Sequence, residues 1–259
     1  MNETFNYFDT GQRSLIKLLE TAFKKGMLYI RNDKNIGMRT GYTWNTPWIH
    51  RGNPPTPERN CILFHGVFLH YTNIIPQKCQ ECWKVVARPR TVKELFQISN
   101  LQKTSVRSSK AGIEKRPSVN GNYGAYWYND SISEGEECRQ YVTELVSHIS
   151  KDIPVFLKRG CTEFEHKYGP SNEWGVSVEN ADLERLITDL IIIEDAEFVG
   201  QPWYVKNHVK SLWIEFAHER GDTTYLEFTD GKPLYPKYVT YESKEEFVNT
   251  SVPVLEEVV

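Results

Sequence analysis

Helical and strand-like segments follow one another in this chain without regular alternation, and this irregular order restricts its fold more than any other feature. Residues 15–23 carry apolar side chains at the spacing of one helix face, and a similar stripe runs from Cys138 to Ile149. Short apolar runs at 83–89 and 153–157 are typical of buried strands. A doubly wound α/β fold needs regular alternation, so the sequence predicts an α+β fold with a mixed or antiparallel sheet and several packed helices.

Capping and turn signals predict where several of these elements begin and end. Thr91 with Glu94, and Ser133 with Glu136, have the spacing of a capping box at a helix N-terminus. The Asp-Gly pair within residues 223–235 stands between two strand-like runs, and this dipeptide favours a tight turn between antiparallel strands. The sequence therefore predicts two capped helices and a C-terminal β-hairpin.

Two stretches lack hydrophobic periodicity and are predicted to be loops. Residues 41–60 contain four prolines, and residues 105–111 contain serines and basic side chains. There are no internal repeats and no low-complexity tract. A chain of 259 residues can form one large domain, so we predict a single domain over 1–259, with 129–132 as the candidate boundary for any subdivision.

Composition argues for a soluble, globular protein. Hydrophobic residues make up 39% of the chain and charged residues 25%, which is too apolar for a disordered chain. The longest apolar runs fall short of the roughly 20 residues that a membrane-spanning helix needs. The first residues lack the basic and then apolar pattern of a secretory signal. These features predict a cytoplasmic protein without a membrane partner.

The charge of the chain is divided between its two halves. Residues 1–128 contain 19 Lys and Arg against 8 Asp and Glu, whereas residues 129–259 contain 12 against 26. An asymmetry of this size favours a basic surface that meets an anion, either nucleic acid or a phosphorylated small molecule. The alternative is that the two halves attract each other within the folded protein.

The basic residues are densest within 84–117, where nine of them stand against two glutamates. Arginine holds a phosphate through two hydrogen bonds, whereas lysine acts as a point charge. The candidate phosphate-binding residues are Arg88, Arg90, Arg107, Lys110 and Arg116.

Cysteine spacing gives the one metal-site signal in the sequence. Cys79 and Cys82 form a C-x-x-C pair, a spacing that recurs in zinc and iron–sulfur sites, but no second pair follows. Four ligands must therefore come from distant positions. One candidate quartet is Cys61, His65, Cys79 and Cys82, and the other is Cys79, Cys82, Cys138 and Cys161. We expect Zn²⁺, with an iron–sulfur cluster, a dithiol redox pair, or free thiols and no cofactor as the alternatives.

Candidate acid–base groups occur in two places. The segment 160–166 contains Cys161, Glu163, Glu165 and His166, and in an extended conformation its two glutamates share a face with the cysteine. Glu114 stands beside basic residues at 115–116, where an ordinary surface ion pair is the simpler interpretation. The predicted catalytic set is Glu114, Glu163, Glu165 and His166.

Several common catalytic motifs are absent from the sequence. It contains no Walker P-loop, no glycine-rich dinucleotide motif after a strand, no H-E-x-x-H, no G-x-S-x-G and no zinc-deaminase signature. Two hypotheses remain. The first is a metal–thiolate enzyme, a transferase or hydrolase, that acts on nucleic acid or a phosphorylated substrate. The second is a non-catalytic, zinc-stabilised module that binds nucleic acid or a protein.

Overall fold

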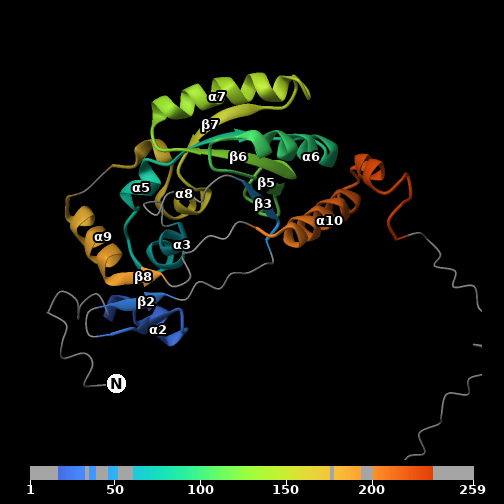
Figure 1. Cartoon of the computed structure of the whole chain (residues 1–259). Helices are drawn as coiled ribbons and strands as arrows, with labels where there is room; N and C mark the ends of the chain where they lie inside the picture. Colours follow the sequence, from blue (N-terminus) through green and yellow to red (C-terminus); the bar gives the residue numbers. More distant parts are fainter. Residues whose placement is uncertain are drawn as a thin grey trace, which may run out of the picture.

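The structure is a computed structural model, and it contains two β-sheets with helices around them (Figure 1). It describes residues 17–32, 35–38, 46–51, 61–175, 178–193 and 201–235. The larger sheet has five strands in the order β3-β5-β6-β4-β7, and every neighbouring pair in it is antiparallel. The bounds are β3 Trp48–Arg51, β5 Ser109–Ile113, β6 Tyr123–Asn129, β4 Trp83–Ala87 and β7 Val155–Arg159. The predicted α+β class is confirmed.

Three helices cover one face of this sheet and form the first hydrophobic core with it. They are α6 (Val92–Leu101), α7 (Ile132–Ser147) and α10 (Trp203–Glu219). Alternate strand residues, such as Val85 in β4 and Trp127 in β6, are fully buried beneath them. Because side chains alternate between the two faces of a strand, the residues between these apolar positions lie on the opposite face.

The opposite face of the sheet carries polar and aromatic side chains in aligned rows. The pairing of β6, β4 and β7 places Tyr128, Lys84 and Lys158 side by side. The pairing of β3, β5 and β6 aligns His50, Lys110 and Tyr126 in the same way. This face therefore presents lysines and tyrosines from strands whose other face is apolar, and the candidate site lies against it.

A second hydrophobic core contains the smaller sheet and most of the remaining helices (Figure 1). The small sheet has the order β1-β2-β8, with bounds Leu28–Ile30, Ile36–Met38 and Ile191–Ile193; β1 and β2 are antiparallel and β2 and β8 parallel. Its helices are α2 Glu20–Lys24, α3 Cys61–Leu63, the π-helix η2 Phe64–Phe68, α4 Leu69–Tyr71, α5 Gln77–Gln80, α8 Thr162–Tyr168 and α9 Val178–Leu190. The described residues also form the short 3₁₀ helices η3 Gln102–Thr104, η4 Ser171–Glu173 and η5 Thr223–Phe228.

One predicted helix cap is confirmed and the other is displaced by two residues. The Thr91 hydroxyl accepts a hydrogen bond from the Glu94 N–H at 3.2 Å at the start of α6. In α7 the cap is Ser131, which has an extended backbone and accepts from the Glu134 N–H at 3.2 Å. The predicted cap Ser133 lies inside the first turn, because Ser131 already satisfies that end of the helix.

Two predicted loops contain strands. Residues 48–51 of the predicted loop 41–60 form β3, and residues 109–111 of the predicted loop 105–111 belong to β5. These two strands pair with each other, so their extended conformation comes from tertiary pairing rather than from a local hydrophobic pattern. Residues 39–45 and 52–60 lie outside the described residues.

The stretch predicted as the first strand of a C-terminal hairpin is helical. Residues Thr223–Phe228 form the 3₁₀ helix η5, because Asp222 caps it and Tyr225 is buried in the first core. The predicted turn residues Asp230 and Gly231 do have positive φ angles of 53° and 75°. Residues from 236 onward lie outside the described part of the chain.

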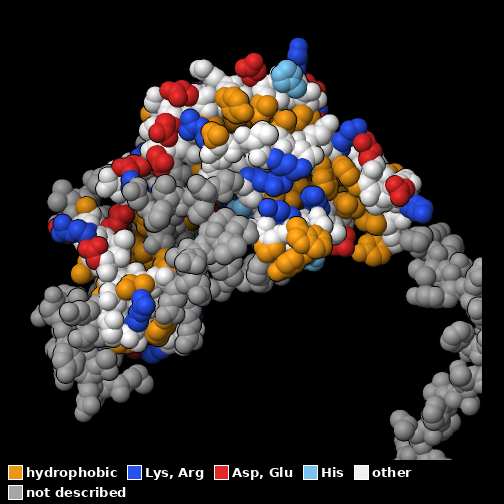
Figure 2. Space-filling view, viewed as in Figure 1, with side chains coloured by type: hydrophobic (Ala, Val, Ile, Leu, Met, Phe, Trp, Pro, Cys, Tyr) orange, Lys and Arg blue, Asp and Glu red, His pale blue; other side chains and the backbone are white. Residues whose placement is uncertain are grey.

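The charged side chains are grouped on the surface. In the view of Figure 2, Lys and Arg side chains gather near the middle of the molecule, while most Asp and Glu side chains lie towards its edges. Residues on both sides of 129–132 share the five-stranded sheet, since β7 comes from the acidic half. Among the described residues, no helix is both long enough and apolar enough to cross a membrane.

Candidate metal–thiolate site

A cavity of about 300 Å³ lies between the polar face of the five-stranded sheet and the second core. Its walls come from the sheet and from three separate segments that carry cysteines, namely 61–65, 78–82 and 161–163. Its reactive and charged lining residues include Cys61, His65, Cys79, Cys82, Lys84, Lys110, Arg116, Cys161 and Glu163. We call this space the thiol cavity.

Four of the five cysteines line the thiol cavity. All four members of the first predicted quartet, Cys61, His65, Cys79 and Cys82, are among its lining residues, and Cys161 joins them. The second predicted quartet is divided. Cys138 belongs to α7 and is buried in the first core, on the other side of the sheet. All five cysteines are free thiols.

The end of strand β7 brings Cys161 to the C-x-x-C segment. The Gly160 N–H donates to the Cys82 carbonyl oxygen at 2.8 Å, and the Arg159 Nε donates to the Gln80 carbonyl oxygen at 2.7 Å. Gly160 has a φ of 63°, and a Cβ there would lie 2.4 Å from the Trp174 ring. Glycine is therefore required at this position for the chain to turn from β7 towards the cavity.

Cys161, His65 and Glu163 form the most compact group of ligand atoms in the cavity. One sulfur, nitrogen or oxygen atom from each lies within 4.8 Å of the others. Cys161 immediately precedes α8, Glu163 lies in its first turn, and His65 lies in η2. Cysteine, histidine and glutamate are all zinc ligands, so this group could hold a metal ion.

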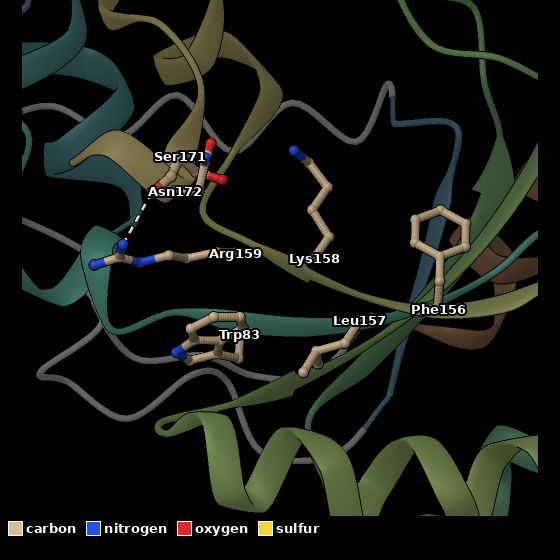
Figure 3. A pocket seen from close by; sticks show the side chains of 7 residues that line it. All are labelled: Trp83, Phe156, Leu157, Lys158, Arg159, Ser171 and Asn172. Carbon is tan, nitrogen blue, oxygen red and sulfur yellow. Dashed lines mark hydrogen bonds between the residues drawn. The ribbon is translucent and has the colours of Figure 1, made fainter.

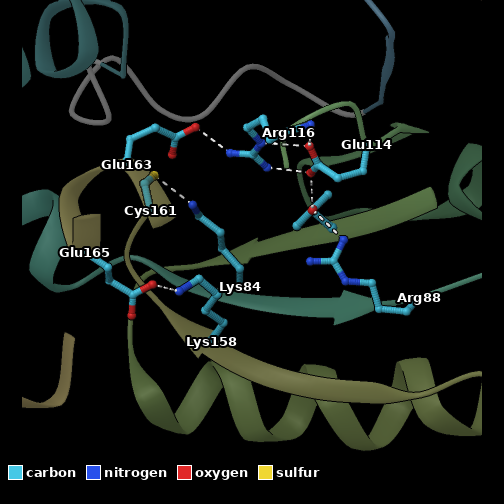
Figure 4. A network of polar contacts seen from close by, with 9 residues as sticks. Lys84, Arg88, Glu114, Arg116, Lys158, Cys161, Glu163 and Glu165 are labelled. Atoms are coloured by element: carbon cyan, nitrogen blue, oxygen red, sulfur yellow. Dashed lines mark hydrogen bonds and ion pairs between the residues drawn. The ribbon is translucent and has the colours of Figure 1, made fainter. Parts of the chain in front are cut away.

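Lys84 and Cys161 form a charged pair. The Lys84 Nζ donates to the Cys161 Sγ at 2.8 Å, and Figure 4 shows the two side chains approaching from β4 and from the start of α8. Burial raises the pKa of the Cys161 thiol, but Lys84 and a hydrogen bond with His65 lower it more, to about 6. At neutral pH Cys161 is therefore a thiolate.

Two other thiols of the cavity, Cys61 and Cys79, remain protonated in the protein alone. Burial, together with the nearby Cys161 and Cys82, raises the pKa of Cys61 to about 11. Burial also raises the pKa of Cys79, and the three neighbouring cysteines raise it further. These mutual effects show that the four sulfur atoms lie close enough for their negative charges to repel one another, and a bound cation would relieve that repulsion.

Lys110 lies beside the thiols without an acidic partner among the described residues. Its Nζ is 4.5 Å from the centre of the Trp48 ring and 5.4 Å from that of Tyr126. Burial and the nearby Lys84 lower the pKa of Lys110 to about 8. An ammonium group in such a position favours an anion in the cavity.

Arg116 joins two of the predicted catalytic glutamates (Figure 4). Its Nε donates to one carboxylate oxygen of Glu114 at 2.8 Å, its NH2 donates to the other at 2.6 Å, and its NH1 donates to Glu163. The Glu114 side chain is only 1% exposed. Although burial raises the pKa of Glu114, Arg116 lowers it more, so this carboxylate is ionised. The Tyr126 hydroxyl connects the group to Arg88, whose NH1 donates to it at 3.1 Å.

The other predicted site residues lie away from the thiol cavity. Arg90 pairs with Glu94 and Asp152, and Arg107 donates to the Asn129 side chain at 2.9 Å. Because residues 162–168 form helix α8 instead of the expected extended segment, Glu163 and Glu165 do not share a partner. Glu165 binds Lys158, and His166 is exposed.

A second, more open depression of about 510 Å³ lies along the edge strand β7 (Figure 3). It is lined by Trp83, Phe156, Leu157, Lys158, Arg159, Ser171 and Asn172. Arg159 is committed to the carbonyl oxygens of Gln80 and Ser171, and Lys158 to Glu165. This depression therefore offers fewer free reactive groups than the thiol cavity.

The sequence predictions missed Lys84 as a site residue and did not join Cys161 to the first quartet. Residues 83–87 have the sequence WKVVA, in which Lys84 stands between two residues that face the helices. This alternation indicates that Lys84 lies on the polar face of the sheet. Nothing in the spacing connects Cys161 with residues 61–82. Comparison of the chain with protein families, curated proteins and solved structures found no match.

Proposed function

We propose that this protein carries a metal–thiolate centre in the thiol cavity and acts there on an anionic, phosphate-bearing substrate. The observation that supports the proposal is the convergence of four cysteines, from three segments distant in the sequence, on one cavity that also contains lysines and an arginine. Thiolates are the ligands that soft metal centres prefer, and a surplus of cations beside them favours an anionic ligand.

The cysteine arrangement is better explained by a metal than by hydrophobic packing. Cys79 and Cys82 are 5% and 6% exposed, but a cysteine that only fills the core has no need of other thiols beside it. Cys138 illustrates the packing role, since it is buried in the first core and lies outside the thiol cavity. Four neighbouring sulfur atoms lose their protons together only when a cation compensates their charge.

Lys110 is the cation of the cavity that favours an anionic substrate beside a bound metal. Four thiolates around a dipositive centre carry a net charge of about −2. Of the cations that line the cavity, Lys78 pairs with Glu81, Arg116 with Glu114 and Glu163, and Lys84 with the Cys161 sulfur. Lys110 and Arg116 are the side chains from the predicted phosphate-binding set that reach this cavity, and we assign Lys110 to the substrate phosphate, because it forms no ion pair with a described residue.

A second candidate function is nucleophilic catalysis by Cys161 without a metal. The approach of His65 and Glu163 to the Cys161 sulfur, within 4.8 Å, is the observation that favours it. A cysteine, a histidine and an acidic residue in contact can form a nucleophile, its base and the group that orients the base. In this case a transferase or hydrolase reaction passes through a covalent intermediate on Cys161.

Metal content separates the two functions. The protein is purified anaerobically and its metals are measured per chain for the wild type, C79S, C82S and C138S. We expect a bound metal in the wild type and in C138S, and its loss in C79S and C82S. C138S is the matched control, because it removes a buried thiol outside the cavity. A wild type without metal, also after anaerobic incubation with zinc or with iron and sulfide, contradicts the proposed metal centre and favours the nucleophilic cysteine.

A further inference from the structure

We propose that the centre is an iron–sulfur cluster held by Cys61, Cys79, Cys82 and Cys161, rather than a single zinc ion. This inference rests on the proposed metal–thiolate function and specifies its cofactor. Three observations carry it, namely the spacing of the four sulfur atoms, the volume of the cavity and the hydrogen bond from Lys84 to a ligand sulfur.

The four sulfur atoms are spaced too widely for one ion. A tetrahedral zinc site with Zn–S bonds of about 2.3 Å holds its sulfurs about 3.8 Å apart. Among the described residues, the group of ligand atoms within 4.8 Å of one another contains a single cysteine, Cys161, together with His65 and Glu163. The four cysteines nevertheless line one cavity. Several metal and sulfide atoms between the thiolates account for that wider arrangement.

The cavity is larger than a single ion requires. It measures about 300 Å³, whereas a water molecule, which is of the order of a bound ion in size, takes up about 30 Å³. The cysteines approach this space from different sides: Cys61 from α3, Cys79 from α5, Cys82 from the segment before β4, and Cys161 from the segment before α8. A polynuclear cluster fills such a space and contacts all four ligands.

Lys84 suits a cluster ligand environment. Its Nζ donates to the Cys161 Sγ at 2.8 Å from a buried position on the sheet. Hydrogen bonds and positive charge at cluster sulfurs are two of the factors that set the reduction potential. Lys84 would therefore be a positioning and tuning residue, since it contacts a ligand sulfur rather than the metals themselves.

The proposed cluster is tested by replacing each of its four cysteine ligands in turn. The chain is reconstituted anaerobically with ferrous iron and sulfide, and iron, acid-labile sulfide, visible absorption and the electron paramagnetic resonance of the reduced protein are measured. We expect iron and sulfide in equal amounts, with a loss of at least about tenfold in each of C61S, C79S, C82S and C161S. C138S, H65A and E163Q should retain the cluster.

Lys84→Met provides a second measurement that does not depend on removing a ligand. We expect the variant to retain iron and sulfide but to have a more negative reduction potential, because the reduced, more negative cluster loses a stabilising cation. Lys158→Met is the control, because Lys158 in β7 is paired with Lys84 in β4 but binds Glu165 instead of a cysteine. An unchanged potential in K84M contradicts the assigned contact.

The outcomes distinguish this inference from the proposed function on which it rests. Zinc without sulfide, lost in H65A and E163Q as well as in C161S, overturns the cluster and retains a metal–thiolate protein with a different ligand set. A single iron ion without sulfide likewise overturns the cluster and retains a metal–thiolate protein. Absence of any metal after reconstitution, in a chain whose circular dichroism shows it to be folded, overturns both proposals.

Discussion

Replacing Lys84 with methionine tests the electrostatics of the thiol cavity directly. In the metal-free protein the Lys84 ammonium is 2.8 Å from the Cys161 sulfur, and the Cys161 pKa is lowered from 9.0 to about 6. Methionine keeps the length of the side chain but removes its charge. Burial then continues to raise the Cys161 pKa while His65 alone opposes it, so we expect the pKa to return towards 9.

The size of the effect on reactivity follows from two opposing terms. At pH 7 a thiol with a pKa of about 6 is roughly 90% thiolate, and one with a pKa of about 9 is roughly 1% thiolate. The thiolate of higher pKa is the better nucleophile by about 20-fold over three pKa units. The rate of alkylation at pH 7 should therefore fall by only about fourfold, while the pH midpoint of the rate moves by up to three units. The midpoint is the sharper measurement.

The assay is alkylation of chelator-treated, reduced protein with iodoacetamide from pH 5 to pH 10, with the labelled Cys161 peptide quantified by mass spectrometry. The charged or titratable groups that face Cys161 are Lys84, His65, Glu163, Lys110 and the three other cysteines of the cavity. Lys158→Met is again the control and should keep the midpoint near 6. Equal midpoints in the wild type and in K84M would refute the assignment of the low pKa to the Lys84–Cys161 pair.

Three further predictions concern the surroundings of the cavity. Glu114→Gln should destabilise the protein at pH 7 by about 1–3 kcal/mol, since the buried carboxylate binds Arg116 through both oxygens. The Glu114 pKa is lowered on folding, so its contribution is present above its ordinary pKa of 4.5 and is lost as the pH falls below that value; urea denaturation at pH 7 and pH 4 should show the difference shrinking. Gly135→Ala should destabilise by about 0.5–2 kcal/mol with unchanged metal content, because its Cβ would lie 2.7 Å from Leu157 and 3.3 Å from the Trp83 Cβ, a clash that exceeds the gain in helix propensity. Lys110→Met should weaken binding of inorganic pyrophosphate about tenfold in calorimetry, and wild-type affinity should fall as the pH rises through about 8, where Lys110 loses its proton; equal affinity in K110M would contradict its assigned role.

The sequence predicted those parts of the fold that depend on local patterns. The cap at Thr91 is confirmed, and the strand predicted over 83–89 is present as β4 at 83–87, because each is determined by neighbouring residues. Strand β3 and residues 109–111 of β5 were predicted as loops, since their conformation depends on pairing with each other. The η5 segment was predicted as a strand from its local sequence. Its helical conformation depends on burial against the first core, a tertiary effect that the local sequence does not specify.

The candidate site was predictable to the extent that its lining residues are near one another in the sequence. Cys61, His65, Cys79 and Cys82 fall within about twenty residues and line one cavity, as the first quartet required. Cys161 joins them only because Gly160 and Arg159, at the end of β7, bind the backbone of the C-x-x-C segment. That contact is set by strand order, which a single sequence does not specify.

The charge asymmetry of the sequence is resolved in the structure by two different arrangements. Arg90 and Arg107, which lie outside the cavity, are matched by acidic or amide groups, and for these residues attraction within the folded protein is the better explanation. Lys84 and Lys110 lie on the polar face of the sheet, where Lys84 meets a thiolate and Lys110 forms no ion pair with a described residue. A buried or half-buried ammonium is unfavourable unless an anion accompanies it, so Lys110 favours negative charge in the cavity, to which the Cys161 thiolate contributes. A thiolate-ligated cluster and a substrate phosphate, as we propose them, are both negative, and Lys84 and Lys110 would provide their counter-charges in the same cavity.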